Sequence, residues 1–175
     1  MPSDASGRHP SGVLVRPAPD FFDDNLATGG FWLQGFAPVQ PHYATIALYN
    51  NDTLSRSLKV YGISVQSEGG SGMAFYFVQG PLGAFYVNCQ NINSQLQTPP
   101  GQIYQQHQNT VAGTLNPYNP AGPWLNIIGS NGFDSNTVFS PFPMFIVSPG
   151  YSLVATNLIF SDDVGCFFWY QVANE

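Results

Sequence analysis

Residues that could carry out catalysis are few in this chain, and they follow no known catalytic pattern. The three histidines, His9, His42 and His107, form no H-x-H or H-E-x-x-H motif, so a zinc or cupin-type metal site is poorly supported. The chain also has no G-x-S-x-G elbow and no Walker loop. The sequence therefore predicts a protein that is not an enzyme and that needs no cofactor.

The acidic residues give little more support for chemistry. Asp162 and Asp163 are adjacent, so in a strand their carboxylates would point to opposite faces and could not act together as a glycosidase pair. A pairing with Glu68 or Asp134 in three dimensions stays open, but a solvated turn is the favoured interpretation. The acidic stretch at residues 20–25 lacks the glycine and terminal glutamate of an EF-hand, so a turn is again favoured over a metal site.

Aromatic residues beside amides supply the chemistry of sugar binding in one polar segment. Aromatic rings suit the C–H surfaces of a sugar, and amides suit its hydroxyl groups. Residues 104–109 read Tyr-Gln-Gln-His-Gln-Asn, and Tyr118 precedes another asparagine. We identify Tyr104, His107 and Tyr118 as candidate glycan contacts on the loops of residues 95–122. The favoured alternative is a long loop whose aromatic side chains anchor it to the sheet.

The chain is poor in charge, and its few basic residues lie in its first third. Charged residues make up 8% of the 175 residues, against about a quarter in an average domain. No Lys or Arg follows Lys59. Nucleic acid needs cations to neutralise its phosphates, so the body of the fold is not expected to bind it, and an anionic membrane is disfavoured for the same reason. A surface poor in charge is typical of one that partners cover.

The N-terminal residues and the cysteines bear on where the protein is made. The first ten residues hold no apolar core, so no secretory signal is predicted, and no run of 18 apolar residues predicts a membrane span. Cys89 and Cys166 lie in apolar, strand-like runs. Buried free thiols are favoured over a disulfide, as in a protein made in the cytoplasm.

The last third of the chain predicts three strands in succession. Pro149-Gly150 predicts a type II turn between two apolar runs, because proline presets the second turn position and glycine tolerates the positive φ of the third. Residues 164–172 form an aromatic and β-branched run with apolar side chains on both faces, Phe167 and Trp169 sharing one of them. This pattern indicates a central strand whose second face is buried or makes a subunit contact.

Further strands are predicted earlier in the chain. Residues 43–49 and 57–65 have strand character, and a slip of the apolar alternation beside Gly62 indicates a bulge. Residues 73–78 and 84–87 are predicted to pair as a hairpin. About eight strands are expected in all, which predicts an all-β, jelly-roll-like antiparallel β-sandwich over residues 42–175.

Residues 1–41 are rich in Pro, Gly and Asp and are predicted to form an extended N-terminal arm. Two short apolar runs in this segment are expected to pack on a neighbouring molecule, and a floppy tail is the alternative. The candidate interface residues of the arm and of the final strand are Val13, Leu14, Val15, Phe31, Trp32, Phe167 and Trp169.

Two pairs of segments carry a resemblance to a known group of proteins. Residues 43–51 end a strand in an asparagine turn before the strand at 58–63, and residues 147–153 hold a Pro-Gly hairpin before the aromatic strand at 164–169. In this the chain resembles the small jelly-roll virion proteins of tailed bacteriophages, such as capsid decoration or cement proteins and head fibres. The resemblance covers residues 43–172 and implies a dimer or trimer in the virion, made in the host cytoplasm.

Two functions follow as expectations. In the first, the chain is a non-enzymatic virion protein that decorates or cements a capsid, with the major capsid protein or other virion proteins as partners. Apolar burial of the sheet face and the arm would hold neighbouring subunits together. In the alternative, it is a receptor- or glycan-binding fibre or tip module that uses the loops of residues 95–122.

Overall fold

The structure is a computed structural model, and it describes residues 26–33, 42–67, 72–91, 98–109, 126–129, 136–157 and 164–173. These residues form twelve strands and no helix. The strands are β1 (Leu26–Leu33), β2 (His42–Tyr49), β3 (Ser57–Ser67), β4 (Gly72–Gln79), β5 (Ala84–Asn88), β6 (Gln90–Asn91), β7 (Gln102–Asn109), β8 (Asn126–Gly129), β9 (Asn136–Phe139), β10 (Phe145–Val147), β11 (Tyr151–Asn157) and β12 (Val164–Ala173).

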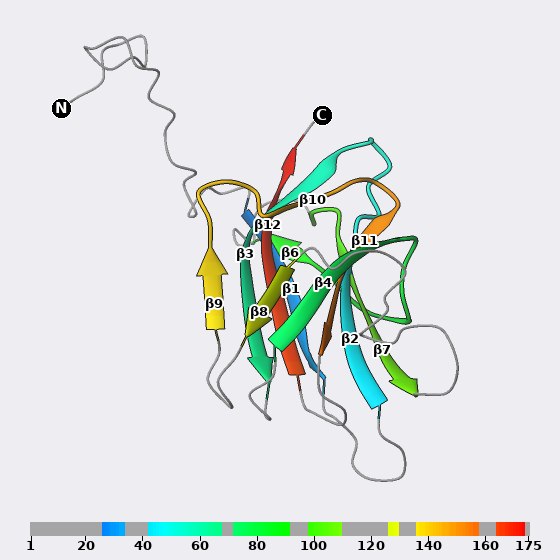
Figure 1. Ribbon diagram of the computed structural model, residues 1–175. Coiled ribbons are helices and arrows are strands. Elements are labelled where there is room, and N and C mark those ends of the chain that lie inside the picture. Colours follow the sequence, from blue (N-terminus) through cyan, green and yellow to red (C-terminus); the bar gives the residue numbers. More distant parts are fainter. Residues whose placement is uncertain are drawn as a thin grey trace, which may run out of the picture.

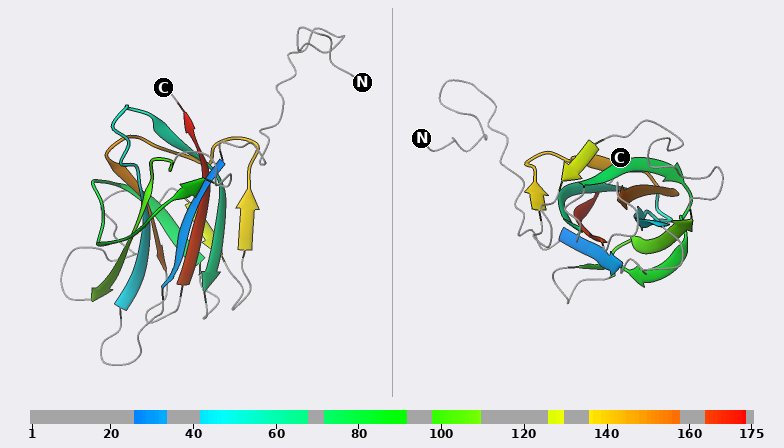
Figure 2. Two further views of the ribbon diagram at one scale, coloured as in Figure 1. Left: turned by 180° about the vertical axis from the view of Figure 1, so that it is seen from behind. Right: turned by 60° about the horizontal axis from the view of Figure 1, so that its bottom comes forward.

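The strands form two antiparallel sheets that face each other (Figure 1). The first sheet has the order β10-β3-β12-β1-β6, with β9 also paired to β3. The second sheet has the order β5-β7-β2-β11-β4-β8. Seen from below, the two sheets curve around a common interior (Figure 2). The predicted all-β sandwich is therefore confirmed.

The pairing of strands is that of a jelly roll. β1 pairs with β12 and β2 with β11, while β3 pairs with β9 and β10 and β4 pairs with β8. Early strands thus pair with late ones in nested order, and the two halves of the chain wrap together as in a double Greek key. β5, β6 and β7 lie between β4 and β8 in the sequence and are an insertion into this plan. The insertion adds β7 and β5 to the second sheet beyond β2.

The interior is filled by the inward side chains of both sheets. Phe75 of the second sheet stacks on Phe145 of the first, with ring centroids 5.7 Å apart. Phe168 and Tyr170 of β12 are fully buried, as the aromatic alternation of that strand predicts. The largest buried side chains of this core are Tyr170, Phe75, Phe168, Ile46, Leu48, Leu58, Ile63, Met73, Ile103 and Leu153.

Three local predictions can be compared directly with the structure. Gly150 has φ of +77°, and the N–H of Tyr151 donates to the carbonyl of Ser148, so the predicted Pro-Gly turn is confirmed. The register of β12 on β3 shifts beside Gly62, which confirms the predicted bulge. The predicted hairpin of residues 73–87 is wrong, because β5 pairs with β7 at the opposite edge of the sheet from β4 and β8.

The predicted boundary between arm and sandwich also needs correction. Residues 26–33, placed in the arm with Phe31 and Trp32, form β1 and pair along their whole length with β12. This segment has low intrinsic strand propensity, because it contains two glycines and few β-branched residues. It forms a strand because it pairs with β12. Val13, Leu14 and Val15 lie outside the described residues.

Candidate interaction surfaces

The outer face of the first sheet carries a cluster of aromatic side chains from two strands that flank β3. Phe139 of β9 and Trp169 of β12 both stand opposite Gly62 of β3, and their ring centroids are 5.2 Å apart. A Cβ atom on Gly62 would collide with the ring of Phe139. The glycine therefore lets the two rings meet across the middle strand.

Phe167 extends this cluster along β12. Its neighbours in the register are Ser64 on β3 and Gly30 on β1, and neither is large enough to cover an aromatic ring. Phe167 is 40% exposed and Phe139 is 47% exposed, while Trp169 is half-buried. We call Phe139, Phe167 and Trp169 the β9–β12 aromatic patch. It contains both predicted interface residues of the final strand.

The edge of the first sheet beside this patch is interrupted by prolines. β9 and β10 pair with successive parts of β3, and residues 140–144 between them contain Pro141 and Pro143. Between these prolines Phe142 projects into solvent with 65% of its surface exposed, and Ile146 on β10 is 51% exposed. Because proline offers no N–H to a pairing strand, residues 140–144 resist strand addition at this edge.

The outer face of the second sheet has a second aromatic group on the inserted strands. Tyr104 of β7 lies between Phe85 of β5 and Tyr49 of β2, with ring centroids 5.8 Å from each and edge-to-face geometry. Phe85 is 51% exposed and its neighbour Tyr86 is 45% exposed. The register is irregular here, since Phe85 pairs with Tyr104 and Val87 with Ile103, which leaves Tyr86 as the extra residue of a bulge.

Two amide side chains, Gln102 and Asn88, lie next to this aromatic group on the neighbouring cross-strand pair. The Tyr104 hydroxyl donates to Gln102 Oε1 at 3.3 Å, and Gln102 Nε2 donates to Asn88 Oδ1 at 3.1 Å. Asn88 and Gln102 stand opposite each other in the register of β5 and β7. We call Phe85, Tyr86, Asn88, Gln102 and Tyr104 the β5–β7 surface.

The remainder of that outer face is closed by a small cluster of its own. Ala47, Tyr76 and Val154 are buried there, and Leu82 from the loop between β4 and β5 packs against them. The hydroxyl of Tyr76 finds no hydrogen-bond partner among the described residues, and burial raises the pKa of this phenol. Leu82 thus belongs to the structural part of this face, whereas Phe85 and Tyr86 lie exposed beyond it.

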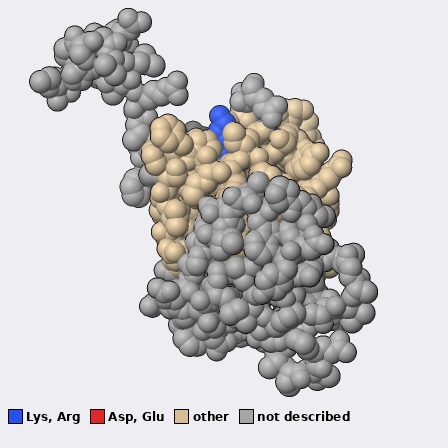
Figure 3. All heavy atoms as spheres, in the orientation of Figure 1, with Lys and Arg blue, Asp and Glu red and all other residues tan. Residues whose placement is uncertain are grey.

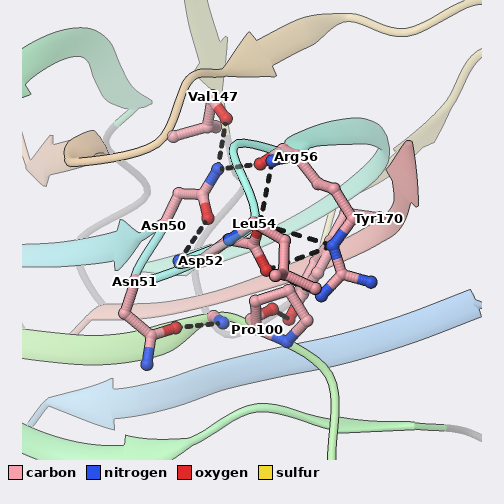
Figure 4. Close-up of polar contacts among 9 residues, drawn as sticks. Asn50, Asn51, Asp52, Leu54, Arg56, Pro100, Val147 and Tyr170 are labelled. Atoms are coloured by element: carbon pink, nitrogen blue, oxygen red, sulfur yellow. Dashed lines mark hydrogen bonds and ion pairs between the residues drawn. The ribbon is translucent and has the colours of Figure 1, made fainter. Parts of the chain in front are cut away.

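A polar network closes one end of the sandwich (Figure 4). Asn50, fully buried, donates from Nδ2 to the carbonyls of Arg56 at 2.9 Å and Val147 at 2.8 Å and accepts from the N–H of Asp52. The Asp52 carboxylate pairs with Arg56 at 2.7 Å, and hydrogen bonds from Arg56 lower the pKa of that carboxyl. All of these groups have partners, so the network holds the loop of residues 50–56 in place.

Tyr170 ties the core to the loop that precedes β7. Its hydroxyl donates to the carbonyl of Pro100 at 2.7 Å, and a Cβ atom on Gly101 would collide with that hydroxyl. Gly101 has φ of +131°, a conformation that also favours glycine. Cys89 lies beside this phenol, and both Cys89 and Cys166 are buried free thiols, as the sequence predicts.

The structure describes only some of the candidate glycan contacts. Tyr104 lies in β7, an eight-residue strand, where the sequence predicts a long connection with a short strand at residues 103–104 as a possible part of it. The backbone of His107 belongs to the same strand, but its side chain lies outside the described part, as does all of Tyr118. Sequence reasoning missed Phe85, Tyr86 and Phe139, because their clusters join strands that are far apart in the chain. No alternation with buried neighbours marks them, since β5 and β9 contain no buried residue.

Charged groups are scarce on the described surface. In the face shown in Figure 3, the described atoms are almost all tan, with a small blue area near the top and no red. Among the described residues, no three His, Cys, Asp or Glu side chains group together as a metal site would require. Glu68, Asp134, Asp162 and Asp163, weighed above as carboxylate partners, lie outside the described residues, as does the acidic stretch at 20–25.

Comparisons with known proteins add no relative to this description. No protein-family model, no curated protein and no solved structure matches the chain. No helix long and apolar enough to cross a membrane occurs within the described ranges.

Proposed function

We propose that this chain is a non-enzymatic structural protein of a phage virion that decorates or cements the capsid. The observation that carries the proposal is the β9–β12 aromatic patch, in which the rings of Phe139 and Trp169 meet and Phe167 follows on the same face of β12. Clusters of exposed apolar side chains on a rigid sheet are typical of protein–protein contacts. The resemblance of residues 43–172 to jelly-roll virion proteins supports the same proposal.

The mechanism is burial of apolar surface between neighbouring subunits. A partner that covers the patch removes its rings from water. This stabilises the contact by about 25 cal/mol per Å² of apolar surface buried. Phe142, between β9 and β10, and Ile146 of β10 are further exposed apolar side chains at this edge of the first sheet. The protein binds the assembled shell or a second copy of itself. Because it binds the assembled shell and not free subunits, it stabilises the shell by mass action.

Co-sedimentation with purified capsid shells tests this function. The full-length protein is expected to saturate shells at a fixed ratio to capsid subunits. Phe167→Ser and Phe139→Ser are each expected to weaken binding about ten-fold or more, because a ring at the centre of an interface contributes on the order of 1–3 kcal/mol. Phe85→Ser, an equally exposed ring on the other sheet, is the matched control and should bind as the parent does. Saturation that is identical for all four proteins would refute the proposed contact.

A further inference from the structure

The inserted strands carry the second exposed aromatic surface, which the jelly-roll plan does not require. β5 and β7 extend the second sheet beyond β2, at the sheet edge farthest from β4 and β8. Ladder pairing fixes four residues of the β5–β7 surface, since Phe85 stands opposite Tyr104 and Asn88 opposite Gln102, while Tyr86 is the bulge residue between them. Rings held by a sheet lose little conformational freedom when a ligand stacks on them.

The polar groups of this surface are neutral amides with unused hydrogen-bonding capacity. Gln102 uses its carbonyl oxygen for Tyr104 and one N–H for Asn88. Within the described residues, Asn88 accepts this bond on Oδ1 and its own amide donates none. Asn88 is exposed and Gln102 is partly exposed, so their remaining N–H groups can reach a bound molecule.

The lack of charged side chains on β5, β7 and residues 80–83 disfavours charged ligands. The strands β5 and β7 contain no Asp, Glu, Lys or Arg, nor does the loop of residues 80–83 that precedes β5. An anionic ligand would lack a cation to pair with, and a cationic ligand would lack a carboxylate. A molecule with apolar C–H faces and many neutral hydroxyl groups matches rings and amides at once.

We propose that the β5–β7 surface binds neutral saccharides. The rings of Phe85 and Tyr86 receive the C–H face of a sugar, while Asn88 and Gln102 donate to its hydroxyl oxygens. The site lies on the second sheet, away from the β9–β12 aromatic patch of the first, so binding of sugar does not depend on the capsid contact. The location differs from the loops of residues 95–122 that the sequence suggested, because only Gln102 and Tyr104 fall within that range.

Saturation-transfer NMR with the full-length protein tests the site. The probes are maltohexaose, cellohexaose, chitohexaose and mannohexaose, each at about 5 mM, which detects dissociation constants up to the millimolar range. Transfer from protein aromatic protons to at least one neutral probe is the expected result. Sialyllactose and a heparin hexasaccharide are the charged controls and should receive none.

Variants separate this site from a general stickiness of the protein. Phe85→Ala and Asn88→Ala both change exposed side chains, so the fold is expected to persist, and each should weaken binding of the active probe about five-fold or more. Phe142→Ala removes an even more exposed ring, from the segment between β9 and β10, and should leave sugar binding unchanged.

Two outcomes would overturn the proposal. One is the absence of transfer to all four neutral probes. The other is a change of sedimentation coefficient in Phe85→Ala without any sugar binding by the parent, which would assign this surface to contacts between copies of the chain. Loss of capsid binding in the Phe167→Ser variant with sugar binding retained would leave this inference standing.

Discussion

A buried tyrosine hydroxyl can either stabilise or destabilise the fold, depending on whether it has a hydrogen-bond partner. Tyr170 donates to Pro100, whereas the hydroxyl of Tyr76 has no partner in the part of the chain that the structure describes. A buried polar group without a partner costs about 1–3 kcal/mol, and a satisfied one contributes on the order of 1 kcal/mol. The same chemical change at these two positions should therefore have opposite signs.

We predict that Tyr76→Phe raises the free energy of unfolding by about 1 kcal/mol and that Tyr170→Phe lowers it by about 1–3 kcal/mol. The second change leaves the carbonyl of Pro100 without its donor. Urea denaturation followed by tryptophan fluorescence measures both values, with Tyr151→Phe, at an exposed position, as the control. A loss of stability in Tyr76→Phe would show that its hydroxyl has a partner in solution.

At the scale of single strands, β1 has a consequence for the boundary of the arm. β1 lies between β12 and β6, and pairs with β12 from Leu26 to Leu33. Its removal would uncover one side of β12, which holds the buried Cys166, Phe168 and Tyr170. A truncation that passes residue 25 therefore removes part of the sheet.

We predict that deleting residues 1–24 leaves the midpoint of thermal unfolding within a few degrees of the full-length value. Deleting residues 1–40, which also removes β1, should abolish cooperative unfolding or lower the midpoint by more than about 10 °C, because a ladder of the first sheet is lost. Circular dichroism on heating distinguishes the two. If the longer deletion unfolds like the full chain, β1 contributes no stability. Loss of capsid binding in the shorter deletion would assign a contact to residues 1–24.

Local signals account for what the sequence predicted well among the strands. The Pro149-Gly150 turn and the bulge at Gly62 depend on the conformations of one or two residues. β7 is polar, and within its first five residues only Ile103 is a buried apolar side chain, so its order depends on pairing with β2 and β5. Such non-local pairing leaves no local signature.

The same distinction applies to the candidate surfaces. Phe167 and Trp169 were predicted because they alternate with core residues in one strand. Phe139 was missed because it joins them only when β9 pairs with β3 opposite Gly62. Likewise, Phe85 approaches Tyr104 only through the pairing of β5 with β7. A single sequence does not contain these registers explicitly.

Considered as a whole, the molecule buries several weakly acidic groups in neutral form. Burial raises the pKa of Cys89 to about 11, and raises the pKa values of Cys166, Tyr76 and Tyr170 well above their usual range. In the unfolded chain the thiols ionise near pH 9. Above that pH the unfolded state binds fewer protons than the folded state, so stability falls as pH rises.

We predict that the free energy of unfolding falls steadily between pH 9 and about pH 11, by about 1.4 kcal/mol per pH unit for each thiol. The double variant Cys89→Ala, Cys166→Ala should have a shallower slope over this interval. Urea titrations at a series of pH values measure both slopes. Equal slopes would mean that the two thiols ionise equally well in both states. In the same experiment below pH 8, both thiols should resist Ellman's reagent until the chain unfolds.

The pairing of β1 with β12 also sets the order of events during synthesis. Leu26 finds its partner only when Gln171 has been made, and β3 likewise gains its longest neighbour only then. Until that moment the ribosome carries a chain whose apolar strands have open edges, and such edges are prone to aggregate. Closure through distant residues also makes folding slow compared with a chain of local hairpins. A nascent chain stalled before β12 should therefore be bound by chaperones and sensitive to protease, and become resistant only once residue 173 is free to join the sheet.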